Sequence, residues 1–327
     1  MVASVLVGTG SYLPEKVLTN QDLSKIVDTS DEKIVKRTGI KKRHIAADGE
    51  FTSDLALQAA KNALDSAGIE PNDLDGIIVA SFTIDKPLPA TSNILQHKLG
   101  ITNKCLSFDM QAACSGLLYA INVADSMLNF NPGIKRMLIV GAEKMSSTVD
   151  WEDRTTCVLF GDGAGAIVLE STDDTDEDCM VASNLGSDGT YCDILQIPAG
   201  GTAMPTTKEV LDQRLQYVKM EGQEVFKLAV GNMVAACKRA MEDAGVTIDQ
   251  VKWLVPHQAN YRILKAVASR LSIPEERVYV NVDRYGNTSA ASIGICLDEM
   301  ARGNMVQRGD YVLLTAFGGG LTWGAVL

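Results

Sequence analysis

Cysteine pairs, histidine clusters and long apolar runs are all missing from this chain of 327 residues. Its seven cysteines form no Cys-x-x-Cys pair and no Cys/His ligand spacing, so we expect neither a metal site nor a disulfide framework. No apolar run approaches the roughly 18 residues of a membrane helix, and residues 1–10 lack the basic segment of a signal peptide. These absences predict a cytoplasmic protein with reduced thiols, no bound metal and no membrane contact.

Positive charge is also scarce, because 41 acidic residues face 30 basic ones and the net charge is −11. This balance argues against nucleic acid as a partner, although a local basic patch could still bind an acidic protein. The hydrophobic share of 46% and the charged share of 22% are those of an ordinary globular protein. At this length the chain can form one large domain or two fused halves.

Two distant stretches share one pattern, an alanine-rich amphipathic helix that ends at a glycine and precedes an apolar strand. Residues 59–69 lead into the strand 76–80, and residues 235–246 lead into the strand 251–255. Proteins of the α/β class commonly repeat this helix–strand pattern, but a nearly constant spacing between matches favours an internal duplication. The further matches, in the same order, pair 108–109 with 282–283, 137–142 with 311–316, and 164–169 with 322–327.

The duplication predicts two halves, 1–171 and 172–327, that each alternate strands and helices. Their sheets should be mixed and covered by helices on both faces. A pseudo-twofold axis would bring the turn at Cys114 and the turn at Asn287 to one central crevice. The acidic stretch 171–178 between the halves has no periodicity and predicts a solvated connection rather than a metal-binding loop.

Cys114 follows an apolar strand and a turn of small residues, and it precedes the apolar helix that begins near Leu117. The unpaired N–H groups and the positive end of a helix favour the thiolate, which is the nucleophilic form of cysteine. A lone cysteine is more often a small core residue. The partners of Cys114 therefore decide between the two interpretations.

Two later segments supply such partners. His257 follows the strand 253–255 and a proline, which puts it at a strand end where sites form. The alternative is a hydrogen-bonded core histidine, which is how we interpret His44 and His97. Asn287 lies in a Gly-Asn-Thr-Ser run, where capping of a helix is the alternative role. Cysteine, histidine and asparagine beside small residues are typical of an acyl-transfer site.

Two glycine-rich segments have different interpretations. Residues 317–324 suit a backbone N–H that faces an oxyanion, because no helix follows that could hold a phosphate. Residues 160–166 look like a dinucleotide fingerprint, but they run into an apolar strand instead of a helix, so we reject nucleotide cofactor binding.

Taken together, these segments resemble the β-ketoacyl-acyl-carrier-protein synthase III family, the initiating condensing enzymes of bacterial fatty acid synthesis. The likeness runs from Val5 to the C-terminus. It implies an α/β, thiolase-like fold, internally duplicated as a five-layered α/β/α/β/α arrangement with mixed sheets, and a homodimer. The matching motifs are 8–14, 29–32, 37–40, 113–116, 160–166, 257–260, 286–292 and 318–320.

The resemblance implies a role for each residue of the triad. Cys114 attacks an acyl-coenzyme A thioester and carries the acyl group, while the N–H groups of Cys114 and Gly319 hold the oxyanion. His257 and Asn287 donate hydrogen bonds to the thioester carbonyl of malonyl-acyl carrier protein and stabilise the enolate formed when carbon dioxide departs. Coenzyme A is then a substrate, and no cofactor is expected.

Further positions match the family's substrate and partner contacts. For the cations among them, the alternative is a solvated surface charge. Contacts to coenzyme A or the acyl chain are implied for Thr29, Arg37, Arg154, Gly222, Phe226 and Leu88, the last from a loop that crosses the dimer. Contacts to the acidic carrier protein are implied for Lys227, Arg262 and Arg270.

One position departs from the family pattern. Many members have a tryptophan after the Asp-Glu pair at 31–32, where it stacks on adenine, and this chain has Lys33. Lysine lacks the flat ring, which leaves room for a primer other than acetyl-coenzyme A. One alternative is therefore a ketosynthase of secondary metabolism with an unusual acyl donor. Two others, from different classes of protein, are a cysteine hydrolase that uses Cys114 and His257, and a carrier-binding homologue without catalysis.

Overall fold

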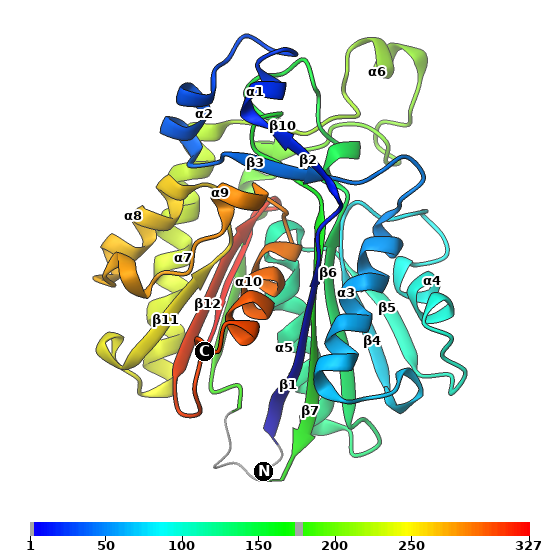
Figure 1. The fold of residues 1–327 in the computed structure, drawn as a ribbon, viewed down its shortest axis with the longest axis vertical. Coiled ribbons are helices and arrows are strands. Elements are labelled where there is room, and N and C mark those ends of the chain that lie inside the picture. Colours follow the sequence, from blue (N-terminus) through cyan, green and yellow to red (C-terminus); the bar gives the residue numbers. More distant parts are fainter. Residues whose placement is uncertain (1–2, 174–178) are drawn as a thin grey trace.

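The computed structural model describes residues 3–173 and 179–327, and its frame consists of two mixed β-sheets. In the first sheet β4 pairs in parallel with β5 and β6, whereas β7 is antiparallel to both β1 and β6. In the second sheet β11 and β12 are parallel and the remaining pairs are antiparallel (Figure 1). The first sheet has the order β1 (Ala3–Tyr12), β7 (Gly163–Thr172), β6 (Arg136–Glu143), β4 (Gly76–Ala80) and β5 (Leu106–Met110). The second has the order β11 (Val251–Pro256), β12 (Tyr311–Gly318), β13 (Thr322–Val326) and β8 (Ser183–Ser187).

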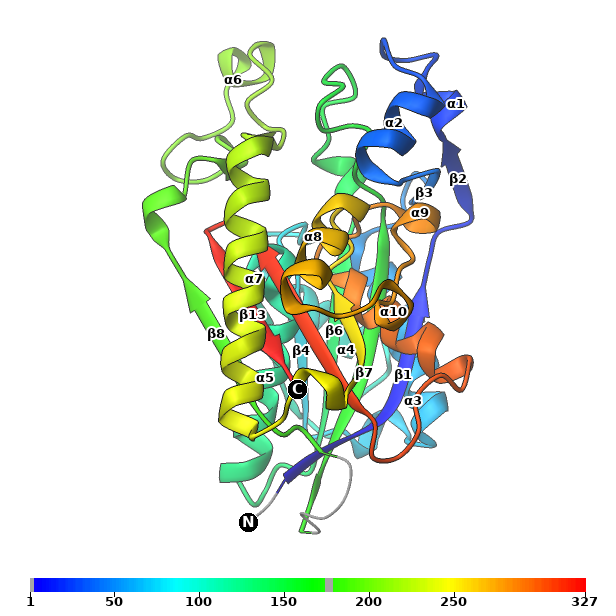
Figure 2. The same cartoon turned by 90° about the vertical axis from the view of Figure 1, so that its left-hand side faces the viewer.

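Helices form three layers around these sheets. Helices α3 (Thr52–Ala67) and α4 (Thr91–Lys98) cover the outer side of the first sheet. Helices α5 (Gly116–Phe130) and α10 (Ala291–Arg302) lie between the sheets and contact both. Helices α7 (Gly222–Ala244) and α8 (Tyr261–Leu271) cover the second sheet on its far side (Figure 2). The five-layered, thiolase-like arrangement expected from the resemblance is confirmed.

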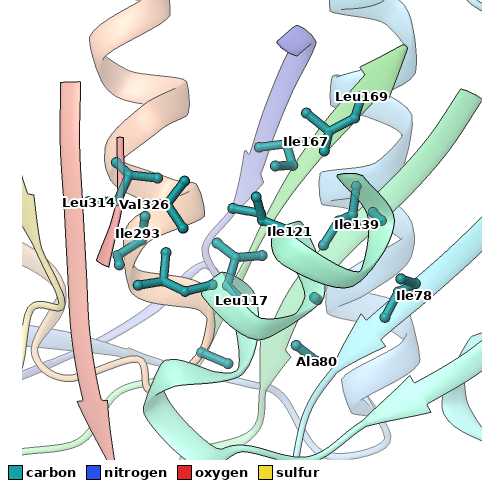
Figure 3. Packing of buried hydrophobic residues seen from close by; sticks show 14 of the residues in the cluster. Ile78, Ala80, Leu117, Ile121, Ile139, Ile167, Leu169, Ile293, Leu314 and Val326 are labelled. Carbon is teal, nitrogen blue, oxygen red and sulfur yellow. The ribbon is translucent and has the colours of Figure 1, made fainter. Parts of the chain in front are cut away.

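The central layer holds the two sheets together through apolar contacts. Leu117 and Ile121 of α5 are nearly fully buried between Ile139 of the first sheet and Leu314 of the second (Figure 3). Burial of each such side chain contributes about 1.5–3 kcal/mol. Small residues let α10 approach the first sheet closely, since a Cβ on Gly141 would lie 2.3 Å from the carbonyl oxygen of Ala290. The N-terminus of α10 is thereby fixed against the sheet.

The two sheets repeat one topology, because the order β8-β13-β12-β11 corresponds to β1-β7-β6-β4. Helices α3 and α7 both end at left-handed glycines, Gly68 and Gly245, each with φ of 66°. The counterpart of β5 is reduced to a single parallel bridge between Leu254 and Val278 in the part of the chain that is described. These features support our proposed division after residue 171. Most of the acidic connection, 174–178, lies outside the described residues.

The shorter elements gather at one end of the molecule, above the carboxyl ends of the parallel strands (Figure 1). None of the helices in the described ranges has the length and apolar character to cross a bilayer. The short elements are β2 (Lys16–Thr19), α1 (Asn20–Leu23), α2 (Asp31–Thr38), β3 (Lys42–Ile45), β9 (Leu195–Gln196), α6 (Lys208–Asp212), β10 (Lys219–Met220) and α9 (Val282–Tyr285). Single 3₁₀ turns span Pro71–Asp73, Ala113–Ser115, Met145–Ser147, Gly189–Tyr191, Ile248–Gln250 and Glu275–Arg277.

Candidate active site

Cys114 lies in the 3₁₀ turn between β5 and α5, as the sequence predicts for a strand-to-helix turn. The hydroxyl of Thr322 donates to the carbonyl of Ala112 at 3.0 Å, and the hydroxyl of Ser115 donates to Thr322 at 2.8 Å. The end of β12 presses against the same turn, since a Cβ on Gly318 would lie only 2.7 Å from the Cys114 nitrogen. The second half of the chain therefore positions the thiol of the first half.

His257 follows the last residue of β11, where its backbone N–H donates to the carbonyl of Thr315 at 2.7 Å. Its ring nitrogen Nδ1 lies 2.7 Å from the hydroxyl of Ser292. That hydroxyl also accepts from the backbone N–H of Gln258 at 3.4 Å, so its own proton is free to bond Nδ1. We therefore assign the ring proton to Nε2. Burial lowers the pKa of His257 to about 3, which makes the imidazole a neutral hydrogen-bond donor.

Asn287 lies between α9 and α10 and is 7% exposed. Its backbone is held by two hydrogen bonds to the 159–161 segment, of 2.8 and 3.0 Å. Its side-chain oxygen accepts the N–H of Ser289 at 2.9 Å, so the NH₂ group remains as the donor. Gly286 has φ of 70°, and a Cβ there would lie 2.8 Å from the carbonyl oxygen of Leu159. Glycine is thus required where the chain approaches this loop.

One cavity of about 1010 Å³ brings together Cys114, His257, Asn287 and Gly319. Cys114 and Gly319 both line this cavity, so their backbone N–H groups can serve a ligand oxygen. Apolar side chains line much of the remaining wall. They include Phe82, Met145, Leu195, Val218, Phe226 and Phe317.

The predicted substrate contacts divide into two groups. Arg37, Gly222, Phe226 and Arg262 line the cavity, and the Arg262 guanidinium lies 5.7 Å from the Phe226 ring centre. The others lie outside its lining. Arg154 instead pairs with Asp28 at 3.2 Å, Thr29 is half-buried, and Leu88, Lys227, Arg270 and Lys33 are exposed.

The protonation of Cys114 differs from the expectation based on a helix terminus alone. Burial raises the pKa of its thiol to about 11, and the charge of Glu143 acts in the same direction. A hydrogen bond with Ser289, 3.5 Å from the sulfur, opposes this rise. Desolvation penalises the thiolate wherever no cation compensates. This environment therefore favours the neutral thiol of Cys114 over its thiolate.

Two residues that contact the triad, and a third that contacts one of these two, were not singled out from the sequence. Ser292 orients His257, Ser289 contacts Cys114, and Glu143 contacts Ser289 at 3.3 Å. The serines fall in a small-residue run where helix capping is the default interpretation. The only available signal for Glu143 was a single acidic residue at the end of the apolar strand 136–143.

No group of three His, Cys, Asp or Glu side chains that could hold a metal ion occurs within residues 3–173 and 179–327. The reactive groups of the cavity are a thiol, a neutral imidazole, a carboxamide and two backbone N–H groups. Such a set can bind a thioester, exchange its acyl group onto sulfur, and stabilise negative charge on a carbonyl oxygen.

Comparison with known proteins gives consistent matches along the chain. Residues 108–189 match the 3-oxoacyl-[acyl-carrier-protein] synthase III family, and residues 241–327 match the C-terminal region of the same family. A β-ketoacyl-[acyl-carrier-protein] synthase III of Rhodospirillum centenum is 49% identical, with 99% of this chain and 98% of the relative covered. The corresponding protein of Erythrobacter litoralis is 48% identical, with 100% and 99% covered.

Solved structures agree with these matches. The 3-oxoacyl-[acyl-carrier-protein] synthase III of Aquifex aeolicus has a TM-score of 0.90 at 46% identity, with 99% of this chain and 98% of that chain covered. A priming β-ketosynthase of a polyketide biosynthetic pathway also has a TM-score of 0.90, at 32% identity, with 99% and 96% covered.

Proposed function

This chain belongs to the β-ketoacyl-[acyl-carrier-protein] synthase III family, and we propose that it condenses an acyl-coenzyme A primer with malonyl-acyl carrier protein. The reaction is a decarboxylative Claisen condensation, which gives a 3-oxoacyl-acyl carrier protein and initiates fatty acid synthesis. The observation that carries the proposal is the convergence of Cys114, His257 and Asn287 on one cavity.

In the first half-reaction, the sulfur of Cys114 attacks the thioester carbonyl of the primer. The tetrahedral oxyanion accepts hydrogen bonds from the N–H groups of Cys114 and Gly319, two residues that line the cavity. Preorganised donors of this kind lower a barrier by about 3 kcal/mol each. Coenzyme A leaves as the thiol, and the acyl group remains on Cys114.

In the second half-reaction, Nε2–H of His257 and the NH₂ group of Asn287 bind the thioester carbonyl of the malonyl substrate. Loss of carbon dioxide places negative charge on that oxygen, and the enolate carbon then attacks the acyl-cysteine. A neutral imidazole suits this role because it keeps its proton as a donor, and its low pKa supports the assignment. The side-chain oxygen of Asn287 is already engaged by Ser289, which directs the amide correctly.

The finer assignments concern the substrates and partners. We propose that Arg37, Arg154 and Thr29 contact the nucleotide end of coenzyme A, and that Gly222 and Phe226 contact its pantetheine and acyl portions. Arg37, Gly222 and Phe226 line the cavity, which supports their part of this set. We propose that Lys227, Arg262 and Arg270 bind the acidic carrier protein, since all three are exposed on α7 and α8.

We further propose a cytoplasmic homodimer without a cofactor. Leu88 is 84% exposed in the single chain, which suits a side chain that closes the acyl cavity of a second copy. No disulfide bond joins the seven cysteines, all of which fall in the described part of the chain, and this supports a reducing compartment.

The test is mass spectrometry of the intact protein after exposure to a panel of acyl-coenzyme A donors, followed by addition of malonyl-acyl carrier protein. We expect one acyl group on Cys114, which then disappears as carbon dioxide and the 3-oxoacyl product form. Release of free acid without malonyl-acyl carrier protein would contradict the proposal in favour of a hydrolase. The preferred donor would also show whether exposed Lys33 selects a primer other than acetyl.

A further inference from the structure

A buried chain of side chains leads away from Cys114 through Ser289 to Glu143. The hydroxyl oxygen of Ser289 lies 3.5 Å from the sulfur of Cys114 and 3.3 Å from Oε1 of Glu143. Ser289 and Glu143 both have 0% exposure. The Ser289 hydroxyl is within donating distance of both groups, but it has one proton and serves one of them at a time. When it donates to Glu143, its oxygen is left to accept the proton of the thiol.

The surroundings of Glu143 hold its carboxylate as an acceptor. The hydroxyl of Ser81 at 3.1 Å, the N–H groups of Phe82 at 3.3 Å and Thr83 at 3.1 Å, and the Thr83 hydroxyl all donate to it. These groups are neutral, and Glu143 has no ion-pair partner within the described ranges. Cys114 is the titratable group whose charge couples to it. Burial raises the pKa of Glu143 to about 7, which suits a base that works near neutrality.

A thiol whose thiolate is disfavoured by desolvation needs such a base, and His257 is poorly suited to serve. Its Nδ1 is occupied by Ser292, its Nε2 carries the proton that the second half-reaction uses, and its pKa is about 3. A carboxylate reached through one hydroxyl is the acceptor that remains in contact with the sulfur.

We propose that Glu143 accepts the proton of Cys114 through Ser289 as the sulfur attacks the primer. The inference rests on the proposed function. The S–H proton passes to the Ser289 oxygen while the Ser289 proton passes to Oε1 of Glu143, so Ser289 stays neutral. The sulfur forms its bond to the carbonyl carbon, and the bond from that carbon to the coenzyme A sulfur breaks. The departing coenzyme A thiolate takes a proton from solvent. Glu143 keeps its proton until the condensation releases the Cys114 thiolate, which takes that proton back through Ser289.

The experiment measures single-turnover acylation of Cys114 by rapid quench and mass spectrometry across pH 5.5 to 9. In the wild type we expect a rate that rises with a midpoint near pH 7, where Glu143 ionises. Ser289→Ala and Glu143→Gln should each lower the rate about 10²-fold at pH 7.5 and remove that midpoint, because general bases contribute on this scale. Ser289 has φ of 50°, and alanine keeps the same Cβ, so the backbone cost is unchanged.

The double variant Glu143→Gln/Ser289→Ala separates a relay from two independent effects. In a relay, the double variant acylates Cys114 no more slowly than Ser289→Ala alone, within about twofold. A double variant whose loss of rate equals the product of the two single losses would overturn the proposal. Unchanged rates and pH profiles in the single variants would overturn it as well. Asp298→Asn, which removes another carboxyl with 1% exposure, controls for the stability cost of such a change.

Alkylation of Cys114 by iodoacetamide gives a second measurement that needs no acyl transfer. We expect the alkylation rate of Ser289→Ala to lose its midpoint near pH 7 as well. This variant still tests the relay if Glu143→Gln fails to fold. If no acyl-coenzyme A acylates the wild type, the proposed function fails while alkylation still tests the relay. An alkylation profile of Ser289→Ala identical to that of the wild type would exclude the relay.

Discussion

The two halves of this chain have corresponding turns, and the two turns present different residues to the cavity. In the first half, the turn after β5 presents Cys114 at the start of α5. The sequence match places Thr288 at the corresponding position before α10, and there the neighbouring Asn287 faces the cavity instead. Thr288 itself is 1% exposed and does not line the cavity. On the proposed function, the repeated topology supplies a nucleophile from one half and a hydrogen-bond donor from the other.

The serines after these two positions show the same divergence. Ser115 donates to Thr322 and stabilises the turn, whereas Ser289 contacts the sulfur of Cys114 and the carboxylate of Glu143. The strand before each turn differs too, because β5 is complete while its counterpart is a single bridge at Val278. Duplication supplies matching positions, and the local contacts determine what each position does.

The largest expected effect comes from replacing Cys114, the residue that distinguishes the first turn from the second. Cys114→Ser should lower acyl transfer by roughly 10⁴-fold or more, because a serine hydroxyl is intrinsically a far weaker nucleophile than a cysteine thiol. Thr288→Ser is the matched change in the other half and should leave acylation within a few-fold of the wild type. Mass spectrometry of the acyl-enzyme measures both, and comparable losses would mean that the turns are not functionally distinct.

The donors of the second half should affect the second half-reaction alone. His257→Ala and Asn287→Ala should each reduce malonyl decarboxylation about 10²- to 10³-fold while self-acylation changes by less than about tenfold. Release of carbon dioxide and acylation of Cys114 are measured separately. If either variant blocked acylation as completely as Cys114→Ser, the division of labour between the halves would be wrong.

Close packing between the halves gives a smaller effect. Gly318→Ala places a methyl group 2.7 Å from the Cys114 nitrogen, so the turn must move, at a cost of about 1–3 kcal/mol in unfolding free energy. Acylation should slow as well. Gly231→Ala in α7, where nothing lies within 4 Å, should instead stabilise by about 0.5–1 kcal/mol. Urea unfolding of both variants tests the difference in sign.

The last expected effect is a pH dependence of stability. The pKa of His257 is about 3 in the folded protein. Between pH 6.5 and 3 the imidazole is therefore protonated in the unfolded chain but not in the folded protein. This lowers wild-type stability by about 2 kcal/mol between pH 7 and pH 5. Glu143, with its pKa raised to about 7, contributes in the opposite direction over this interval. His257→Asn should therefore gain about 2 kcal/mol relative to the wild type on acidification, and parallel unfolding curves at the two pH values would contradict this.

Much of the fold followed from local pattern. The glycine-closed helices α3 and α7, the first strand and the strand after Phe160 all formed where periodicity and turn residues predict them. The absence of a helix after residues 160–166 is also seen, since β7 follows directly. The reduced counterpart of β5 was not predictable, because residues 278–280 are as apolar as a strand and only their packing limits their pairing.

The candidate site was partly predictable. Cys114, His257 and Asn287 could be named because each follows a strand or turn of recognisable composition, and the structure brings them to one cavity. Ser292 and Glu143 could not, because a hydroxyl or carboxylate reveals its partner only in three dimensions. The protonation of Cys114 could not be predicted either, since the helix terminus is visible in sequence and the extent of burial is not.

The sequence by itself determined the halves, the order of their elements and the identity of the reactive side chains, because periodicity, turn chemistry and residue type are local properties. Only the tertiary structure decided which hydroxyls contact the triad and which carboxylate lies behind them, and that desolvation favours the neutral thiol and the neutral imidazole. Hydrogen-bond partners and desolvation depend on segments more than a hundred residues apart, such as Cys114 and Ser289, meeting where water is excluded.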